Sequence, residues 1–302
     1  MISFKKKETL VQNIAYMGLM AAINVVFVLL TAFVPLLFLL IVFVLPLTST
    51  IVALHCKKIY FPIYAFATIG LCMLVTIWKI DDTIFYVIPS IVSGFVFALL
   101  VEKEIPAPWI IIATSIIQFG FSLASIPLIN LMFNRSIIET FATPFGLKDY
   151  AYLDYIVPLF VFFLSLVQSI LSFIVINEEI KKFGFVLKEA KLSANPILIG
   201  LLSSLIMMVI FAFIYKPIAY VFLAISVYFT CLIIAGLLAK KAIWIYISIP
   251  VIALISFFLF ALLYKNVPSP LGLLMIGIFS VLILIIGFID NCLLKDKNKD
   301  TI

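Results

Sequence analysis

The chain contains apolar runs that are too long for the core of a water-soluble domain. The first run extends from about residue 10 to residue 54. As one straight helix it would be about 70 Å long, whereas the hydrocarbon layer of a bilayer is about 30 Å thick. The run must therefore fold back on itself, and Pro35 in AFVPLL is the predicted turn. This feature predicts two membrane-spanning helices at the start of the chain.

Eight further apolar runs follow. They cover about residues 59–77, 83–101, 107–133, 152–176, 197–214, 217–238, 242–263 and 270–292. The sequence therefore predicts an all-α, polytopic transmembrane helical bundle of about ten helices, within a range of about eight to ten. Its composition agrees, because only 11% of the residues are charged, compared with about 25% in soluble proteins. The lipid bilayer is the first predicted partner.

The basic residues predict the orientation. With the N-terminus inside, fifteen of the twenty lysines and arginines fall on the inner side. The outer five are Lys79, Arg135, Lys148, Lys216 and Lys265. Because cytoplasmic loops carry an excess of Lys and Arg, this asymmetry predicts that both termini are cytoplasmic. The basic residues lie at the ends of apolar runs, so the net charge of +6 reflects topology, and no nucleic-acid partner is expected.

Two long connections interrupt the apolar pattern. The outer one, residues 134–150, carries apolar residues at near-helical spacing, and two interpretations remain open: an interfacial amphipathic helix or a lid over the bundle. The inner one, residues 177–196, is either a helix on the inner leaflet or a coupling surface for a cytoplasmic partner. It divides the chain into a six-helix core, 1–176, an amphipathic connector, 177–196, and C-terminal helices with a basic tail, 197–302.

Catalytic motifs are missing from the sequence. His55 is the single histidine, which excludes HExxH and His-rich metal sites. The four cysteines form no CxxC pair, and there is neither a Walker A motif nor a GxSxG elbow. The sequence therefore predicts a protein that is not an enzyme, with no metal and no cofactor.

Polar side chains inside or beside the spans are the candidates for function, because burying them in lipid is costly. Gln118 could bind a solute or simply hydrogen-bond a neighbouring helix. The outer-side candidates for solute binding are Asn130, Arg135, Glu139 and Asp154, with solvated loop charge as the alternative. Asp290, near the end of the last span, is a candidate coupling acid or a partner for nearby lysines.

Several motifs occur in a familiar order. GLMAAIN in the first helix is followed by LPLTSTIVALHCKK, then by EEIKKFGF after six helices, and finally by IIGFIDNCLLKDKN. This order resembles the YybS family of bacterial multi-pass membrane proteins. That family is distantly similar to the S components of energy-coupling-factor (ECF) transporters and to the rod-shape scaffold MreD.

The resemblance implies a six-helix core like that of an S component, with an outward-facing solute pocket, in a bacterial cytoplasmic membrane. It also implies that small residues on the first helix, here Gly18 and Ala22, contact a transmembrane coupling subunit that works with ATPases. A scaffold like MreD would instead use helix faces and the inner connector, where Lys181, Lys182 and Phe183 are the candidate contacts. The first hypothesis is a solute-binding transporter subunit, and the alternative is a non-catalytic scaffold for envelope or signalling proteins.

Overall fold

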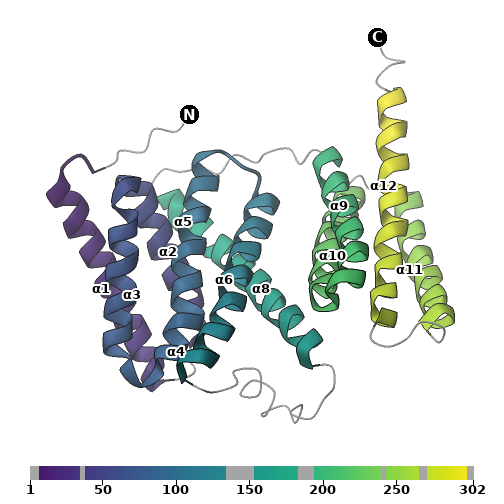
Figure 1. Cartoon of the computed structure of the whole chain (residues 1–302). Helices are drawn as coiled ribbons and strands as arrows, with labels where there is room; N and C mark the ends of the chain where they lie inside the picture. The colour runs from purple at the N-terminus through teal and green to yellow at the C-terminus, as the bar shows by residue number, and fades with distance from the viewer. Residues whose placement is uncertain are drawn as a thin grey trace. The chain divides into compact units, whose positions relative to one another are not determined.

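A computed structural model describes residues 7–34, 38–133, 153–182, 194–239, 243–264 and 271–297. All regular structure in these ranges is helical (Figure 1). The long helices are α1 (Leu10–Phe33), α2 (Phe38–His55), α3 (Phe61–Val75), α5 (Ile88–Glu102), α6 (Ala107–Phe133), α8 (Leu153–Lys182), α9 (Ala194–Ile214), α10 (Lys216–Leu238), α11 (Ile243–Tyr264) and α12 (Gly277–Lys297). Short helical turns cover Lys58–Tyr60, Ile77–Lys79, α4 (Ile80–Asp82), Thr83–Val87 and Leu271–Ile276.

The predicted all-α polytopic bundle is confirmed. Within the described ranges, nine helices are long and apolar enough to cross a membrane, and Val44–His55 of α2 is a shorter apolar segment. Many large apolar side chains point outward, among them Phe66, Leu131 and Phe213, with exposed fractions of 78%, 84% and 86%. Such a surface is stable against lipid and unfavourable against water. The chain is therefore a multi-pass integral membrane protein in contact with the bilayer.

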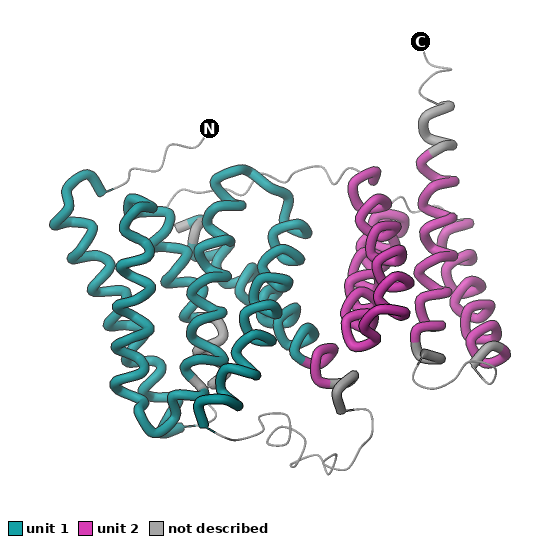
Figure 2. The backbone as a smooth tube through the Cα atoms, in the orientation of Figure 1, with its two compact units in different colours: residues 1–146, 161–190 teal, residues 147–160, 191–302 magenta. Residues whose placement is uncertain are grey.

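The chain divides into two compact units (Figure 2). Unit 1 comprises residues 1–146 and 161–190, and unit 2 comprises residues 147–160 and 191–302. Unit 1 thus holds α1 to α6 and most of α8, whereas α9 to α12 belong to unit 2. Helix α8 continues past the predicted end of its span, so that Lys181 and Lys182 lie in its last turn.

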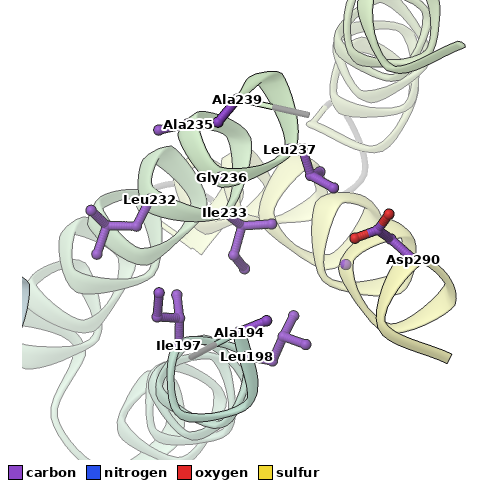
Figure 3. A pocket seen from close by; sticks show the side chains of 11 residues that line it. Ala194, Ile197, Leu198, Leu232, Ile233, Ala235, Gly236, Leu237, Ala239 and Asp290 are labelled. Carbon is purple, nitrogen blue, oxygen red and sulfur yellow. The ribbon is translucent and has the colours of Figure 1, made fainter. Parts of the chain in front are cut away.

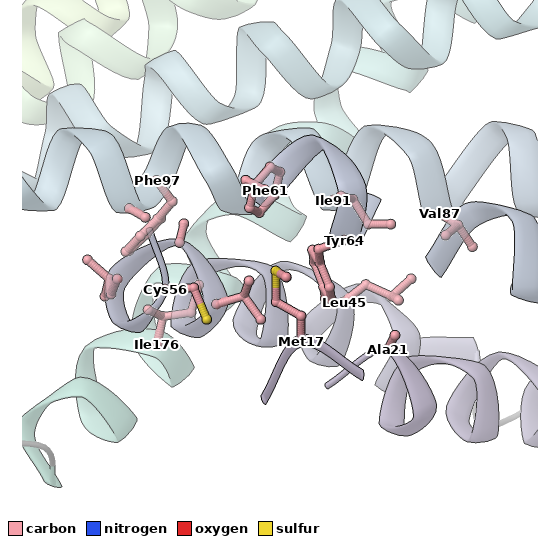
Figure 4. Close-up of a cluster of buried hydrophobic side chains, with 14 of the residues drawn as sticks. Met17, Ala21, Leu45, Cys56, Phe61, Tyr64, Val87, Ile91, Phe97 and Ile176 are labelled. Atoms are coloured by element: carbon pink, nitrogen blue, oxygen red, sulfur yellow. The ribbon is translucent and has the colours of Figure 1, made fainter. Parts of the chain in front are cut away.

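The core of unit 1 forms around the buried face of α1. This helix begins with a capping box between Thr9 and Gln12, which satisfies amide groups that a helix start leaves free. Its buried residues recur every three or four positions: Asn13, Met17, Ala21, Asn24, Val28 and Thr31. They meet side chains from α2, α3 and α5, and Ile176 of α8 joins the same cluster (Figure 4).

Helices α2 and α5 cross at very close range through Gly94. A Cβ atom added at Gly94 would lie 2.5 Å from the carbonyl oxygen of Pro46 and 2.7 Å from Ser49 Cβ. The Thr50 hydroxyl lies 2.7 Å from the Pro46 carbonyl and 2.9 Å from the Gly94 carbonyl, and donates to them. This hydroxyl therefore joins α2 to α5 at the crossing.

The turn between α5 and α6 places these two helices side by side. Ile105 N–H donates to the Leu100 carbonyl and Glu104 N–H to the Val101 carbonyl, which is the pattern of a Schellman motif. Glu104 takes the left-handed conformation this motif needs, with φ of 54°, and Pro106 prevents the helix from continuing. The α5–α6 pair is therefore set by local sequence.

Unit 2 begins with a helical hairpin in which Tyr215 alone separates α9 from α10. The two helices approach closely because Gly200 faces the Phe229 ring, whose Cζ atom would lie 2.8 Å from an added Cβ. Helix α12 packs against both of them, and α11 packs against α12. Unit 2 is thus a compact group of mainly apolar helices.

Candidate functional site

The strongest candidate site lies inside unit 1, where side-chain amides and a hydroxyl link α5, α6 and α8. The Gln118 amide of α6 donates to the Gln168 carbonyl oxygen of α8. Gln168 Nε2 donates in turn to Ser90 Oγ of α5 at 3.1 Å. The three residues are between 1% and 8% exposed. A polar connection of this kind in the middle of three apolar helices orients their facing surfaces.

A π-helical turn, Thr83–Val87, leads into α5 beside this network. The Thr76 and Thr83 hydroxyls lie 2.9 Å apart, and Ser122 of α6 donates to the Phe85 carbonyl at 3.5 Å. A π turn widens the helix and disturbs its regular hydrogen bonding, and such turns occur frequently at functional sites. The Ser122 contact links α6 to this turn.

Further buried hydroxyls lie along α6 and α8, and several of them, such as those of Thr114 and Ser165, donate to carbonyl groups of their own helix. On α6 they belong to Thr114, Ser115, Ser122 and Ser125, and on α8 to Ser165, Ser169 and Ser172. Together with Gln118, Gln168 and Ser90 we call these residues the polar seam. The Ser169 hydroxyl is buried without a hydrogen-bond partner. The seam carries amides and hydroxyls and no ionisable side chain, so it suits a neutral solute that forms hydrogen bonds.

A second polar network in unit 1 joins α1, α2 and α3. Asn24 Nδ2 donates to the Tyr64 hydroxyl at 2.8 Å, and Thr48 Oγ1 donates to Asn24 Oδ1 at 2.7 Å. These side chains are almost completely buried, and Tyr64 stands in the apolar cluster of Figure 4. Asn24, Thr48 and Tyr64 bond to one another across three helices, which is the arrangement expected of interhelical hydrogen bonds that hold a fold together.

The structure describes only some of the predicted solute-binding residues. Gln118 is buried in the polar seam, whereas Asn130 is half-buried in the last turn of α6. The two residues are about 18 Å apart along the axis. Asp154 lies in the first turn of α8. Arg135 and Glu139 lie outside the described residues. Gln118 belongs to the hydrogen-bonded set that links α5, α6 and α8.

The predicted partner contacts on α1 lie on the exposed face of this helix. Gly18 and Ala22 are both exposed, and a Cβ added at Gly18 would meet nothing within 4 Å. At the end of α8, Lys181 is exposed and forms an ion pair with Glu178 at 2.8 Å. Lys182 occupies the last position of that helix, and Phe183 lies outside the described residues.

Asp290 lies in unit 2, where it lines a cavity of about 390 Å³ between α9, α10 and α12. Figure 3 shows its carboxylate among apolar side chains of α9 and α10. The described residues include no group of three His, Cys, Asp or Glu side chains that could hold a metal ion.

Sequence reasoning missed the role of Ser90 and the extent of the polar seam. A signal was present, since Thr114, Gln118, Ser122 and Ser125 recur every three or four residues in an otherwise apolar helix. Comparisons of the chain with protein-family models, curated proteins and solved structures gave no match. The resemblance to the YybS family stays a prediction.

Proposed function

We propose that this chain is the solute-binding membrane subunit of a small-molecule transporter of the ECF type. The observation that carries the proposal is the polar seam, in which Gln118, Gln168 and Ser90 hydrogen-bond to one another. Polar groups inside a transmembrane bundle are costly and often mark the path of a solute. The adjacent π turn, Thr83–Val87, supports the same interpretation.

In this proposal the solute enters from the outer side, between α3, α5, α6 and α8. Its hydroxyl or amide groups replace the contact between Gln118 and Gln168, and Ser169 offers a further hydroxyl. The solute is uncharged and small, because the polar seam contains no counter-ion for a charge. Asn130, Arg135, Glu139 and Asp154 would meet the solute before it reaches the seam.

Energy for transport would come from separate ATPases through a transmembrane coupling subunit, since the sequence carries no Walker A motif. The chain itself would catalyse no reaction. The exposed pair Gly18 and Ala22 supports docking of a partner helix, because small residues let two helix backbones approach closely. We place the protein in a bacterial cytoplasmic membrane with both termini in the cytoplasm, on the distribution of lysines.

A second candidate function is a membrane scaffold for envelope or signalling proteins. The exposed face of α1 that carries Gly18 and Ala22 favours a scaffold, and so does the exposed Lys181 at the end of α8. A scaffold needs partner contacts and no solute. The polar seam would then serve only to hold α5, α6 and α8 together.

Purification of the tagged protein from native membranes in mild detergent, followed by quantitative mass spectrometry, tests the proposal. The wild type is expected to recover a coupling subunit and ATPases in near-stoichiometric amounts, and the double variant Gly18→Leu/Ala22→Leu is expected to lose them. Gly70→Leu on α3 is the matched control, because a Cβ at Gly70 also meets nothing within 4 Å. Recovery of cell-shape or division proteins without ATPases would refute the transporter and favour the scaffold.

A solute screen by thermal shift tests the site itself. A genuine solute is expected to raise the unfolding temperature of the wild type and of Asn24→Leu, but not of Gln168→Leu. Asn24→Leu is the matched control because it breaks the other buried network of the same unit. A solute that stabilises Gln168→Leu as strongly as the wild type would contradict the assignment of the seam.

A further inference from the structure

Unit 2 contains a cavity that the proposed function does not use. Three helices line this open hollow at the end of the unit where α9 begins and α10 ends, and its volume is about 390 Å³. Sites for small molecules typically measure about 300–1,000 Å³ and have mainly apolar walls with a few placed polar groups. The cavity meets both conditions, since its walls are Ala, Ile, Leu and Gly residues and one carboxylate (Figure 3).

The hollow lies beside a close contact between α9 and α12, where several of the lining residues are small. A Cβ added at Gly236 of α10 would meet nothing within 4 Å, whereas one added at Gly287 of α12 would lie 2.6 Å from Leu198 Cδ2. Gly287 therefore lets α12 touch α9, and Gly236 leaves space beside that contact. Ala194 and Ala239 keep the same end of the cavity wide.

Asp290 gives the cavity its chemistry, because it is the charged residue of the described lining. Asp290 is half-buried, and a carboxylate beside apolar walls attracts a cation more strongly than one fully surrounded by water. It also accepts charge-assisted hydrogen bonds from N–H donors. An anion of the same shape would be repelled, and a neutral apolar molecule would gain only from contact with the walls.

The carboxylate end of the cavity is held by a contact between two helices. The residue after Asp290, Asn291, donates its side-chain N–H to Asn195 Oδ1 at the start of α9. This bond joins the two walls beside the carboxylate. A site whose walls are held in place before binding loses less conformational entropy when the ligand enters.

From these observations we propose that unit 2 binds a small lipophilic amine, with its ammonium group on Asp290 and its apolar body between α9 and α10. The shared chemistry is a primary ammonium on an apolar body, and it could come from a free amine or from an aminophospholipid headgroup. The site lies wholly within unit 2 and does not depend on the solute-binding role proposed for unit 1.

Native mass spectrometry of the full-length protein in neutral detergent, with n-octylammonium as the probe, tests this site. The ammonium compound is expected to bind more tightly than n-octanol, and octanoate is expected not to bind. Asp290→Asn should weaken n-octylammonium binding about tenfold, because a hydrogen bond to a charged group is lost, and should leave n-octanol binding unchanged. Equal binding of n-octylammonium and n-octanol to the wild type would overturn the proposal.

A cavity-filling variant tests the location independently of the charge. A Cβ added at Gly236 meets nothing within 4 Å, so Gly236→Leu should extend into the hollow and abolish binding of both compounds, whereas Gly70→Leu in unit 1 should leave both unchanged. Undiminished binding of n-octylammonium to a folded Gly236→Leu protein would also overturn the proposal. Displacement of n-octylammonium by phosphatidylethanolamine, but not by phosphatidylcholine, would support the ammonium site with lipid as its source. Resistance to both lipids would support a free amine.

Discussion

Unit 1 and unit 2 are both built from apolar helices, yet they hold those helices together differently. In unit 1, buried side chains bond across helices: Asn24 to Tyr64, and Gln168 to Ser90. Bonds within single helices occur in both units, since Ser226 and Thr230 of unit 2 donate to carbonyl groups of their own helix, as Thr114 of unit 1 does. The interhelical bonds described in unit 2 join helix ends instead, from Asn291 to Asn195 and from Tyr246 to Leu238.

This difference separates two ways of specifying a membrane fold. Directional bonds permit one relative rotation of the helices, because any other rotation leaves polar groups unpaired in an apolar interior. Apolar packing selects the arrangement by shape alone, and it tolerates a hollow where the residues are small. Unit 1 is thus the more precisely specified unit, and unit 2 is the one that contains a described cavity.

The largest expected effect comes from one methyl group at the α2–α5 crossing. Gly94→Ala places a Cβ against the Pro46 carbonyl and is expected to lower the free energy of unfolding of unit 1 by about 3 kcal/mol, since backbone must move to admit it. Tryptophan fluorescence in a Trp244→Phe background measures this effect, because Trp78 and Trp109 then report unit 1 alone. Gly70→Ala is the control, and an equal loss of stability in that variant would show that the close contact at Gly94 is not the cause.

The next largest effect comes from removing a buried hydrogen bond, and it can be compared between the two units. Asn24→Leu leaves the Tyr64 and Thr48 hydroxyls short of a partner and should destabilise unit 1 by about 2 kcal/mol. Thr230→Val removes a bond within one helix of unit 2 and should change stability by less than about 0.5 kcal/mol. Mixed-micelle unfolding of both variants gives the two values. Equal losses would remove the distinction between the units.

The smallest effect has the opposite sign. Gly236→Ala adds a methyl group in open space and is expected to stabilise unit 2 by about 1 kcal/mol, because alanine is the better helix former. Trp244 reports this change in a Trp78→Phe/Trp109→Phe background. The same Gly→Ala change would then raise stability in one unit and lower it at Gly94 in the other. A destabilised Gly236→Ala protein would show that the wall of the cavity is already filled.

The helices were predictable from the sequence because length and hydropathy decide which segments cross a bilayer. The break predicted near Pro35 illustrates this: α1 ends at Phe33 and α2 begins at Phe38, although Pro35 itself lies outside the described residues. Which helices hydrogen-bond to one another was harder to predict from the sequence. Gln118 could be recognised as an interior polar residue, but its bond to Gln168 depends on how α6 and α8 are rotated, and hydropathy carries no information about rotation.

The cavity was beyond sequence reasoning for a related reason. Gly236 and Gly287 read alike in the sequence, as single glycines in apolar helices. Their surroundings differ only in the folded structure, where Gly287 faces Leu198 and Gly236 faces open space. Asp290 could be identified from the sequence because placing a carboxylate in a membrane span costs free energy. Its apolar surroundings could be seen only in the structure.

The one-residue connection between α9 and α10 has a consequence for how the protein is made. Two helices separated only by Tyr215 close a minimal loop, so they can pair as soon as both have left the ribosome. Helix α12 is synthesised after this hairpin and contributes the carboxylate wall. During biosynthesis, therefore, the hairpin of α9 and α10 would exist first as an open groove, and the amine cavity would form only when α12 docks.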